Sequence, residues 1–104
     1  MAFKETNMPF VEQDPRLYTR EGILALDPGQ TGVYGIFNAT TWIYVGKAED
    51  LRERLLEHLN GDNPCITRYS PTKFVGEKVQ LSNLDAREKE LIRELSPVCC
   101  KRVG

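Results

Sequence analysis

The sequence lacks any run of about 20 consecutive apolar residues, which is the length that a membrane-spanning helix needs. Its N-terminus also lacks the basic-then-apolar order of a secretory signal peptide. We therefore expect a cytoplasmic protein that makes no contact with a membrane. With 104 residues, the chain is long enough for one compact domain with a single core and too short for two.

Cysteine is scarce, with only Cys65 and the adjacent pair Cys99 and Cys100. An odd number of cysteines without paired spacing argues against a disulfide framework, so we expect reduced thiols. The sequence has no Cys-x-x-Cys motif, and we therefore do not expect a structural zinc site.

Net charge is nearly absent as well. The 14 Lys and Arg residues against 15 Asp and Glu leave a charge of −1, so any nucleic-acid role needs a local basic patch. Residues 1–30 are acidic, with three Lys and Arg against five Asp and Glu, and are interrupted by three prolines. We expect an N-terminal extension over residues 1–30 that docks partly on a domain formed by residues 31–104.

Patterning within residues 31–104 predicts an α+β fold. Alternation and enrichment in aromatic and β-branched residues predict strands at Gly32–Asn38, Trp42–Gly46 and Phe74–Leu81. Leucine spacing and capping residues predict helices at Glu49–Leu59, Cys65–Tyr69 and Leu84–Leu95. The expected caps are Asn63 before Pro64, Ser82 or Asn83 for the last helix, and Thr19 for a short apolar run in the extension. The result is a small three-stranded, mainly antiparallel sheet flanked by helices.

One carboxylate of the last helix points toward the core. On a helical wheel begun at Leu84, the side chains of Leu91, Ile92 and Leu95 form an apolar arc about 100° wide, and Glu88 lies in its middle. An ionised carboxylate cannot stay unpaired among apolar side chains, so Glu88 must pair with a cation, take up a proton or bind a metal ion. The residues alone leave open both a structural ion pair and a functional carboxylate.

Arg54 and His58 lie one turn apart beside the leucine stripe of the middle helix. A guanidinium next to an imidazole at the seam between helix and sheet suits a phosphate clamp with a proton-transfer partner. The alternative is that both are ordinary residues at the edge of the core.

The hairpin carries Tyr34 and Tyr44, and its register decides whether the two phenols share a face. A regular even-numbered loop opposes residues 34 and 45 and places the tyrosines on different faces, so a shared face needs an odd loop or a β-bulge, which we predict. Taken alone, two strand tyrosines are typical of packing.

Three of these features recur together at fixed spacing. Gly-Val-Tyr at residues 32–34, Tyr-Val-Gly at residues 44–46 and Arg54 resemble the signature of the GIY-YIG nuclease superfamily, with valine in place of isoleucine in both tripeptides. Residues 44–55 resemble in particular the N-terminal incision domain of the bacterial nucleotide-excision-repair nuclease, and His58 matches a histidine of some homing endonucleases in the superfamily. The resemblance covers about residues 31–100.

The resemblance implies an enzyme that hydrolyses DNA phosphodiester bonds with one divalent metal ion, Mg²⁺ or Mn²⁺. Glu88 matches the metal-binding glutamate, Arg54 would neutralise charge on the phosphoryl group, and Tyr34 would help to take a proton from the attacking water. Tyr44 and His58 would orient the water and the phosphate.

Two requirements follow from this chemistry. A phenol has an ordinary pKa of about 10, so Tyr34 needs nearby cations such as Arg54, Lys47 or the metal to lower that pKa. A small and nearly neutral domain also needs a homodimer or a partner protein for tight binding to DNA. The expected basic face comprises Lys47, Arg52, Arg54, Arg68 and Lys73.

One position departs from the superfamily pattern. An asparagine usually follows a few residues after the proline that ends the last helix, but after Pro97 that slot holds Cys100. This favours an alternative, a catalytically weak or inactive module that binds nucleic acid or protein. A third hypothesis is a plain α+β domain in which Glu88 pairs with Arg54. No recognition helix or zinc finger is visible, so we expect a nuclease to be directed by branched or damaged DNA rather than by sequence.

Overall fold

The computed structural model describes residues 9–100, so residues 1–8 of the expected extension and residues 101–104 of the expected domain lie outside the described part. The elements in chain order are β1 (Arg16–Leu17), α1 (Arg20–Leu24), β2 (Gly32–Phe37), β3 (Trp42–Ala48), α2 (Leu51–Leu59), α3 (Pro64–Arg68), β4 (Lys73–Lys78), the 3₁₀-helix η2 (Leu81–Asn83) and α4 (Leu84–Leu95). The strands pair antiparallel in one sheet, in the order β1-β4-β2-β3. The α+β fold class is confirmed.

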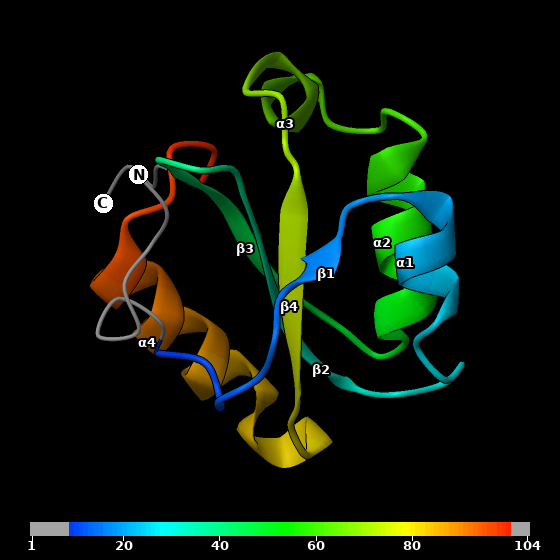
Figure 1. The fold of residues 1–104 in the computed structure, drawn as a ribbon. Helices are drawn as coiled ribbons and strands as arrows, with labels where there is room; N and C mark the ends of the chain where they lie inside the picture. Colours follow the sequence, from blue (N-terminus) through cyan, green and yellow to red (C-terminus); the bar gives the residue numbers. More distant parts are fainter. Residues whose placement is uncertain (1–8, 101–104) are drawn as a thin grey trace.

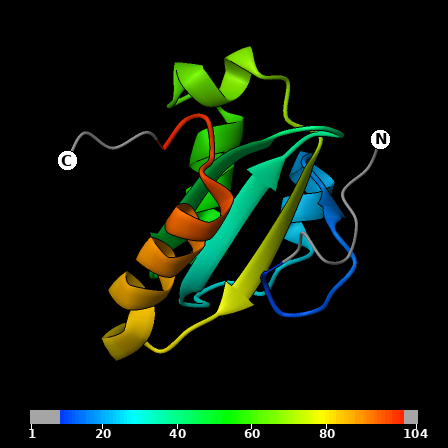
Figure 2. The same cartoon turned by 90° about the vertical axis from the view of Figure 1, so that its left-hand side faces the viewer.

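Helices cover both faces of the sheet. Figure 1 shows the sheet between α4 on one side and α1 and α2 on the other, and Figure 2 shows α4 lying in front of the strands. Buried side chains of β2, β3 and β4 therefore form two cores. The core on the α4 side includes Val33, Val45, Val75, Leu84 and Leu91. The core on the α2 side includes Ile36, Ile43, Leu51, Leu55 and Phe74.

Most helices begin at the capping residues that the sequence predicts. Thr19 accepts a hydrogen bond from Gly22 N–H at the start of α1, and Asn63 accepts one from Cys65 N–H at the start of α3. Asn83 is the cap position of α4 but makes no capping hydrogen bond through its side chain, because η2 runs directly into that helix. None of the helices in residues 9–100 has the length and apolar character needed to cross a membrane.

The sheet has a fourth strand that the sequence did not predict. β1 comprises only Arg16 and Leu17, which lie opposite Phe74 and Lys73 of β4. Both β1 residues are exposed. A segment of two exposed residues has neither the alternation of apolar and polar residues nor the run of apolar residues that predicts a strand. Pairing with a strand from the other half of the chain is what makes these residues a strand.

The segment before β1 also contributes to the core. Phe10 is buried, stacks on the Trp42 ring at a centroid distance of 5.7 Å, and packs closely over Gly35 of β2. A Cβ at position 35 would lie 2.7 Å from a Trp42 ring atom and 2.9 Å from a Phe10 ring atom. Part of the expected extension is thus packed on the sheet, and the division of the chain at residue 30 stays a prediction.

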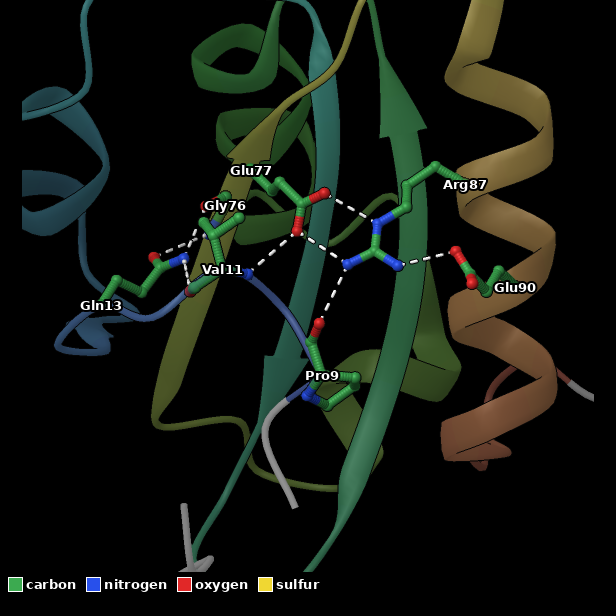
Figure 3. A network of polar contacts seen from close by, with 7 residues as sticks. All are labelled: Pro9, Val11, Gln13, Gly76, Glu77, Arg87 and Glu90. Atoms are coloured by element: carbon green, nitrogen blue, oxygen red, sulfur yellow. Dashed lines mark hydrogen bonds and ion pairs between the residues drawn. The ribbon is translucent and has the colours of Figure 1, made fainter. Parts of the chain in front are cut away.

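A polar network holds this N-terminal segment to β4 and α4 (Figure 3). The Arg87 guanidinium donates two hydrogen bonds to the Glu77 carboxylate, at 2.7 and 3.0 Å, and one to the Pro9 carbonyl at 2.9 Å. The same carboxylate accepts from Val11 N–H at 3.0 Å. The Gln13 side chain both donates to Gly76 O and accepts from Gly76 N–H, in the manner of a neighbouring strand.

Replacing Arg87 with methionine is expected to cost about 2–3 kcal/mol of unfolding free energy at neutral pH, because it leaves the Glu77 carboxylate, whose side chain is only 11% exposed, without its cation. Burial raises the pKa of Glu77, but the bonds from Arg87 and Val11 outweigh it and hold that pKa below its ordinary 4.5. The stabilisation is therefore full above about pH 4.5 and is lost as the pH falls through the lower folded-state pKa.

Urea unfolding of the wild type and Arg87→Met at neutral and acid pH measures this effect. The difference in stability between the two proteins should narrow in acid. Arg93→Met changes an exposed arginine of the same helix and is the matched control. An equal loss of unfolding free energy in Arg87→Met and Arg93→Met would contradict the stabilising role of the Arg87–Glu77 pair.

The expectation of reduced thiols is wrong for two of the cysteines. Cys65, in the first turn of α3, forms a disulfide with Cys99, 34 residues later, across a Cα–Cα distance of 5.8 Å. The partners meet because Cys99 N–H bonds to Ile43 O and so places the C-terminal segment along β3. The spacing of the cysteines in the sequence does not predict that contact. Disulfides are rare in cytosolic proteins, so this bond weighs against the cytoplasmic location, which stays a prediction.

Candidate active site

The two hairpin tyrosines share the face of the sheet that α2 covers. Tyr34 lies opposite Gly46, Tyr44 lies opposite Ile36, and the predicted β-bulge occurs between Ile36 and Phe37. The tyrosine ring centroids are 6.1 Å apart. The bulge therefore places both tyrosines on the same face of the sheet, which a regular even-numbered loop would not do. The two tyrosines are not direct cross-strand partners.

Gly46 lets the Tyr34 phenol lie flat against β3. A Cβ at position 46 would approach the Tyr34 hydroxyl oxygen to 2.5 Å and a ring atom of Tyr44 to 2.9 Å. Contacts that short do not occur in real proteins, so the glycine that closes the Tyr-Val-Gly tripeptide is required by the position of the tyrosines.

Helix α2 brings Arg54 and His58 to these phenols. His58 is buried, and its Nε2 lies 2.7 Å from the Tyr34 hydroxyl oxygen. The Tyr44 ring packs edge-on against the same imidazole at a centroid distance of 5.1 Å. Arg54 lies one turn earlier on the helix. It is near enough to both phenols for its positive charge to lower the pKa of Tyr34 and that of Tyr44. The four residues expected from the hairpin and the middle helix thus form one cluster.

Burial dominates the ionisation of the phenols. It raises the pKa of Tyr34 well above the ordinary value, Tyr44 raises it further, and the opposing effect of Arg54 does not compensate. Of the cations expected to lower this pKa, Arg54 does lower it, but its effect does not outweigh burial. Lys47 faces the other side of the sheet, because it lies opposite Val33 rather than opposite Tyr34. Tyr34 is a neutral phenol at neutral pH, and its proton can move only to a nearby base.

Glu88 lies on α4, which covers the face of the sheet opposite to the one that carries the cluster (Figure 1), and its charge acts on the cluster at Tyr44. Its side chain is 19% exposed, as the helical wheel predicts for a residue turned inward, and its Oε1 is 4.0 Å from Lys47 Nζ. The same lysine bonds to Asp85, one turn earlier on α4. Tyr44 lies on β3, the edge strand, and its pKa is raised first by burial and also by the charge of Glu88, while Arg54 lowers it. Tyr44 is thus the side chain on which the charges of both helical layers act.

The chemistry at Glu88 fits a single hard cation. No group of three or more His, Cys, Asp or Glu side chains in residues 9–100 could hold a metal ion. Mg²⁺ does not need such a cage, because it commonly binds one or two carboxylates, retains several waters and takes its remaining ligands from substrate phosphates. A partly exposed carboxylate such as Glu88 meets that requirement.

The structure adds one carboxylate that the sequence did not indicate. Asp62 accepts from His58 Nδ1 at 2.8 Å and from Arg54 Nη1 at 2.8 Å. It lies beyond the helix stop formed by Asn60 and Gly61, so helical spacing gave no signal for it. The sequence signal that could have indicated Asp62 is its separation of four residues from His58. Beyond the end of a helix, that separation brings two side chains together only if the chain folds back onto the helix.

The cations expected to contact DNA lie on four elements: Lys47 on β3, Arg52 on α2, Arg68 on α3 and Lys73 on β4. Lys47 lies opposite Val33, near the start of β2, and Lys73 lies opposite Phe37, at its end. The two lysines are therefore at opposite ends of the sheet. Contact of these residues with DNA stays a prediction.

Cys100 lies against the edge strand β3, at Val45, the residue after Tyr44. Its Sγ is 3.3 Å from Val45 N and 3.2 Å from Val45 O, and its charge when ionised raises the pKa of Tyr44. The residue in the asparagine slot is thus at the site. A thiol supplies weaker hydrogen bonds there than an amide does.

Comparison with known proteins identifies relatives of this arrangement. A family model described as the GIY-YIG catalytic domain matches residues 30–102. The GIY-YIG N-terminal endonuclease domain of UvrC from Thermotoga maritima, bound to magnesium as its catalytic divalent cation, has a TM-score of 0.65 at 28% identity, over 91% of this chain and 96% of that chain. A point mutant of that domain, also bound to its catalytic divalent cation, has a TM-score of 0.70 at 27% identity, over 96% and 100% of the two chains. No curated protein gives a significant match.

Proposed function

Because this chain belongs to the GIY-YIG catalytic domain family, we propose that it is a metal-dependent endonuclease that hydrolyses DNA phosphodiester bonds. The observation that carries the proposal is the 2.7 Å contact between the Tyr34 hydroxyl and His58 Nε2, next to Arg54. It supplies a proton acceptor for a phenol that burial keeps neutral. The similar UvrC domain was crystallised with magnesium, and we propose Mg²⁺, or Mn²⁺, for this chain.

We assign Glu88 as the residue that would hold the metal ion. When bound, the ion supplies a positive charge that polarises the phosphate and stabilises the leaving oxygen. Arg54 neutralises charge on the phosphoryl group as it develops. Lys47, Arg52, Arg68 and Lys73 are the proposed contacts to the DNA backbone, and they position the substrate without reading its sequence.

Proton transfer in the proposed reaction runs from water through Tyr34 to His58. As the water oxygen attacks phosphorus, its proton passes to the Tyr34 oxygen, and the phenol proton passes to His58 Nε2. The bond from phosphorus to the leaving oxygen breaks, and that oxygen takes a proton from solvent. Tyr34 is neutral before and after the step, so the buried site never has to hold a free phenolate. Tyr44 orients the attacking water.

We further propose that DNA structure or damage directs cleavage. A nearly neutral domain has few phosphate contacts to offer, so affinity would come from a homodimer or a partner protein. The position of Cys100 supports a second candidate function, a catalytically weak or inactive module that binds nucleic acid or protein.

A nicking assay on supercoiled plasmid, linear duplex and branched DNA distinguishes the two functions. We expect cleavage with Mg²⁺ or Mn²⁺ and none with EDTA, and faster cleavage of branched DNA than of linear duplex. Binding of branched DNA without cleavage in either metal would support the second function. Cleavage that persists in EDTA would overturn the metal assignment.

A further inference from the structure

We propose that Asp62 is a positioning residue of this active site, which sets the direction of the hydrogen bond between Tyr34 and His58 and anchors Arg54 beside it. The proposed role rests on the proposed nuclease function. Its structural part, the orientation and tautomer of His58, can be tested without DNA or metal.

The carboxylate of Asp62 uses one oxygen for each partner. Oδ1 lies 2.8 Å from His58 Nδ1, and Oδ2 lies 2.8 Å from Arg54 Nη1. An ionised carboxylate accepts hydrogen bonds and donates none, so the hydrogen of this bond must be on His58 Nδ1. A neutral imidazole carries only one ring hydrogen, and Nε2 is then an acceptor. Tyr34 must therefore be the donor in the 2.7 Å bond to Nε2.

This direction is the one that proton transfer requires. If Nε2 carried the hydrogen, the imidazole would donate to Tyr34 and could not receive its proton. Asp62 thus selects the tautomer in which His58 is a base for the phenol. The same carboxylate stabilises the imidazolium that forms after the transfer, as a buried acid does for a catalytic histidine in other enzymes.

The backbone after α2 holds Asp62 in place. Gly61 has a positive φ of 91°, which turns the chain back onto the helix that has just ended. Gly61 N–H bonds to His58 O at 3.0 Å, and Asp62 N–H bonds to Glu57 O at 3.4 Å. The aspartate is therefore fixed against the last turn of α2, where its side chain contacts the imidazole of His58.

The chain is also anchored beyond Asp62. The side chain of Asn63, the next residue, caps α3 through Cys65 N–H at 3.0 Å, and Cys65 is joined to Cys99 by the disulfide. Cys99 in turn is bonded to β3. The carboxylate thus lies in a short segment that is tied to α2 on one side and to the sheet on the other.

The charges around His58 agree with this assignment. The ionisable groups that act on the imidazole come from β2, β3, α2 and the loop after it: Tyr34, Tyr44, Arg54, Glu57 and Asp62. Burial lowers the pKa of His58 below its ordinary 6.5, and Arg54 lowers it further, while Asp62 and Glu57 raise it. Burial raises the pKa of Asp62, but the hydrogen bonds from His58 and Arg54 outweigh it, so this carboxylate is ionised at neutral pH.

The tautomer can be read directly because His58 is the only histidine in the chain. Nitrogen-15 NMR of the imidazole distinguishes a hydrogen on Nδ1 from one on Nε2, and its titration gives the histidine pKa. We expect the Nδ1–H tautomer in the wild type. In Asp62→Ala we expect loss of that tautomer and a lower His58 pKa, since a carboxylate that raises it has gone. Asp62→Asn keeps the size of the side chain but removes the charge and one of the two acceptor oxygens, so it can accept from His58 or from Arg54 but not from both.

Glu57→Gln is the matched control. Glu57 accepts from the same Arg54 Nη1, at 2.7 Å, but the two imidazole nitrogens bond to Tyr34 and Asp62 instead. We expect this variant to keep the Nδ1–H tautomer. An unchanged tautomer and an unchanged pKa in both Asp62 variants would overturn the proposal, whatever the nuclease activity of the protein.

Kinetics test the consequence for cleavage. We expect Asp62→Ala to lower kcat about 10–100-fold with little change in KM, by analogy with the loss of a hydrogen-bond partner that orients a metal-binding histidine. The acid limb of the pH profile should move to lower pH, following the pKa of His58. If the wild type cleaves DNA and the variant retains both its kcat and its acid limb, the positioning role is wrong. If the wild type does not cleave while the tautomer changes as expected, the proposed function fails and the orientation of His58 stands.

Discussion

Replacing Glu88 with glutamine is expected to reduce DNA cleavage by about 10³-fold or more at saturating Mg²⁺. A bound metal ion contributes several kcal/mol of transition-state stabilisation, and each 1.4 kcal/mol or so is a factor of about ten in rate. Glutamine keeps the size and the polar oxygen of the side chain but removes the negative charge that would hold the cation. The helix should be unaffected, because the side chain is only partly buried.

Single-turnover cleavage of a labelled branched substrate over a range of Mg²⁺ concentrations measures this effect. Glu94→Gln, an exposed glutamate of the same helix, is the matched control and should retain the wild-type rate. Mg²⁺ binding by calorimetry is an independent readout and should be lost together with activity. A Glu88→Gln protein that cleaves at the wild-type rate would show that the metal site lies elsewhere or that the reaction does not need one.

Tyr34→Phe is expected to lower kcat about 10²–10⁴-fold, the range ascribed to a positioned acid or base. The substitution keeps the ring that packs over Gly46 and removes only the hydroxyl that is hydrogen-bonded to His58 Nε2. It also leaves the buried Nε2 without its partner, which should cost about 1–3 kcal/mol of unfolding free energy. Cleavage rates and chemical unfolding of the same variant separate the two effects.

Two further tyrosine variants make this test specific. Tyr69→Phe alters a partly exposed tyrosine after α3 and should change neither rate nor stability. Tyr44→Phe should have a smaller effect than Tyr34→Phe, because its ring packs on His58 but the hydrogen bond to Nε2 belongs to Tyr34. A full rate in Tyr34→Phe combined with loss of cleavage in Tyr44→Phe would reverse the roles of the two phenols.

The pH dependence of wild-type cleavage should follow His58 at its acid limb. The pKa of this histidine lies below 6.5, chiefly because of burial. Neutral His58, the form that accepts a proton, is therefore available at and above about pH 6.5, and cleavage should decline as the pH falls through the lower folded-state value. This behaviour differs from that of an active phenolate, whose activity would continue to rise far into the alkaline range.

Local sequence patterns determined the elements and several of their ends. Leu84–Leu95 has the predicted bounds of the last helix, and Glu88 has the inward orientation that helical periodicity requires. The hairpin tyrosines share a face through the predicted bulge. These features depend on interactions within a few residues along the chain, or on the registry of two strands joined by a short loop, and such interactions are visible in the sequence.

Tertiary structure alone decided the environment of the site. The pairing of β1 with β4, the Cys65–Cys99 bond and the fold-back of Asp62 onto His58 each join segments whose contact no local pattern encodes. The same holds for the direction in which the pKa of Tyr34 is shifted. That direction depends on whether burial, which raises the pKa, outweighs the nearby charge of Arg54, which lowers it. Residue types and spacings therefore identify the groups that can react. Burial and long-range contacts decide which of them holds the proton, because solvation depends on everything that surrounds a side chain rather than on its neighbours in the chain.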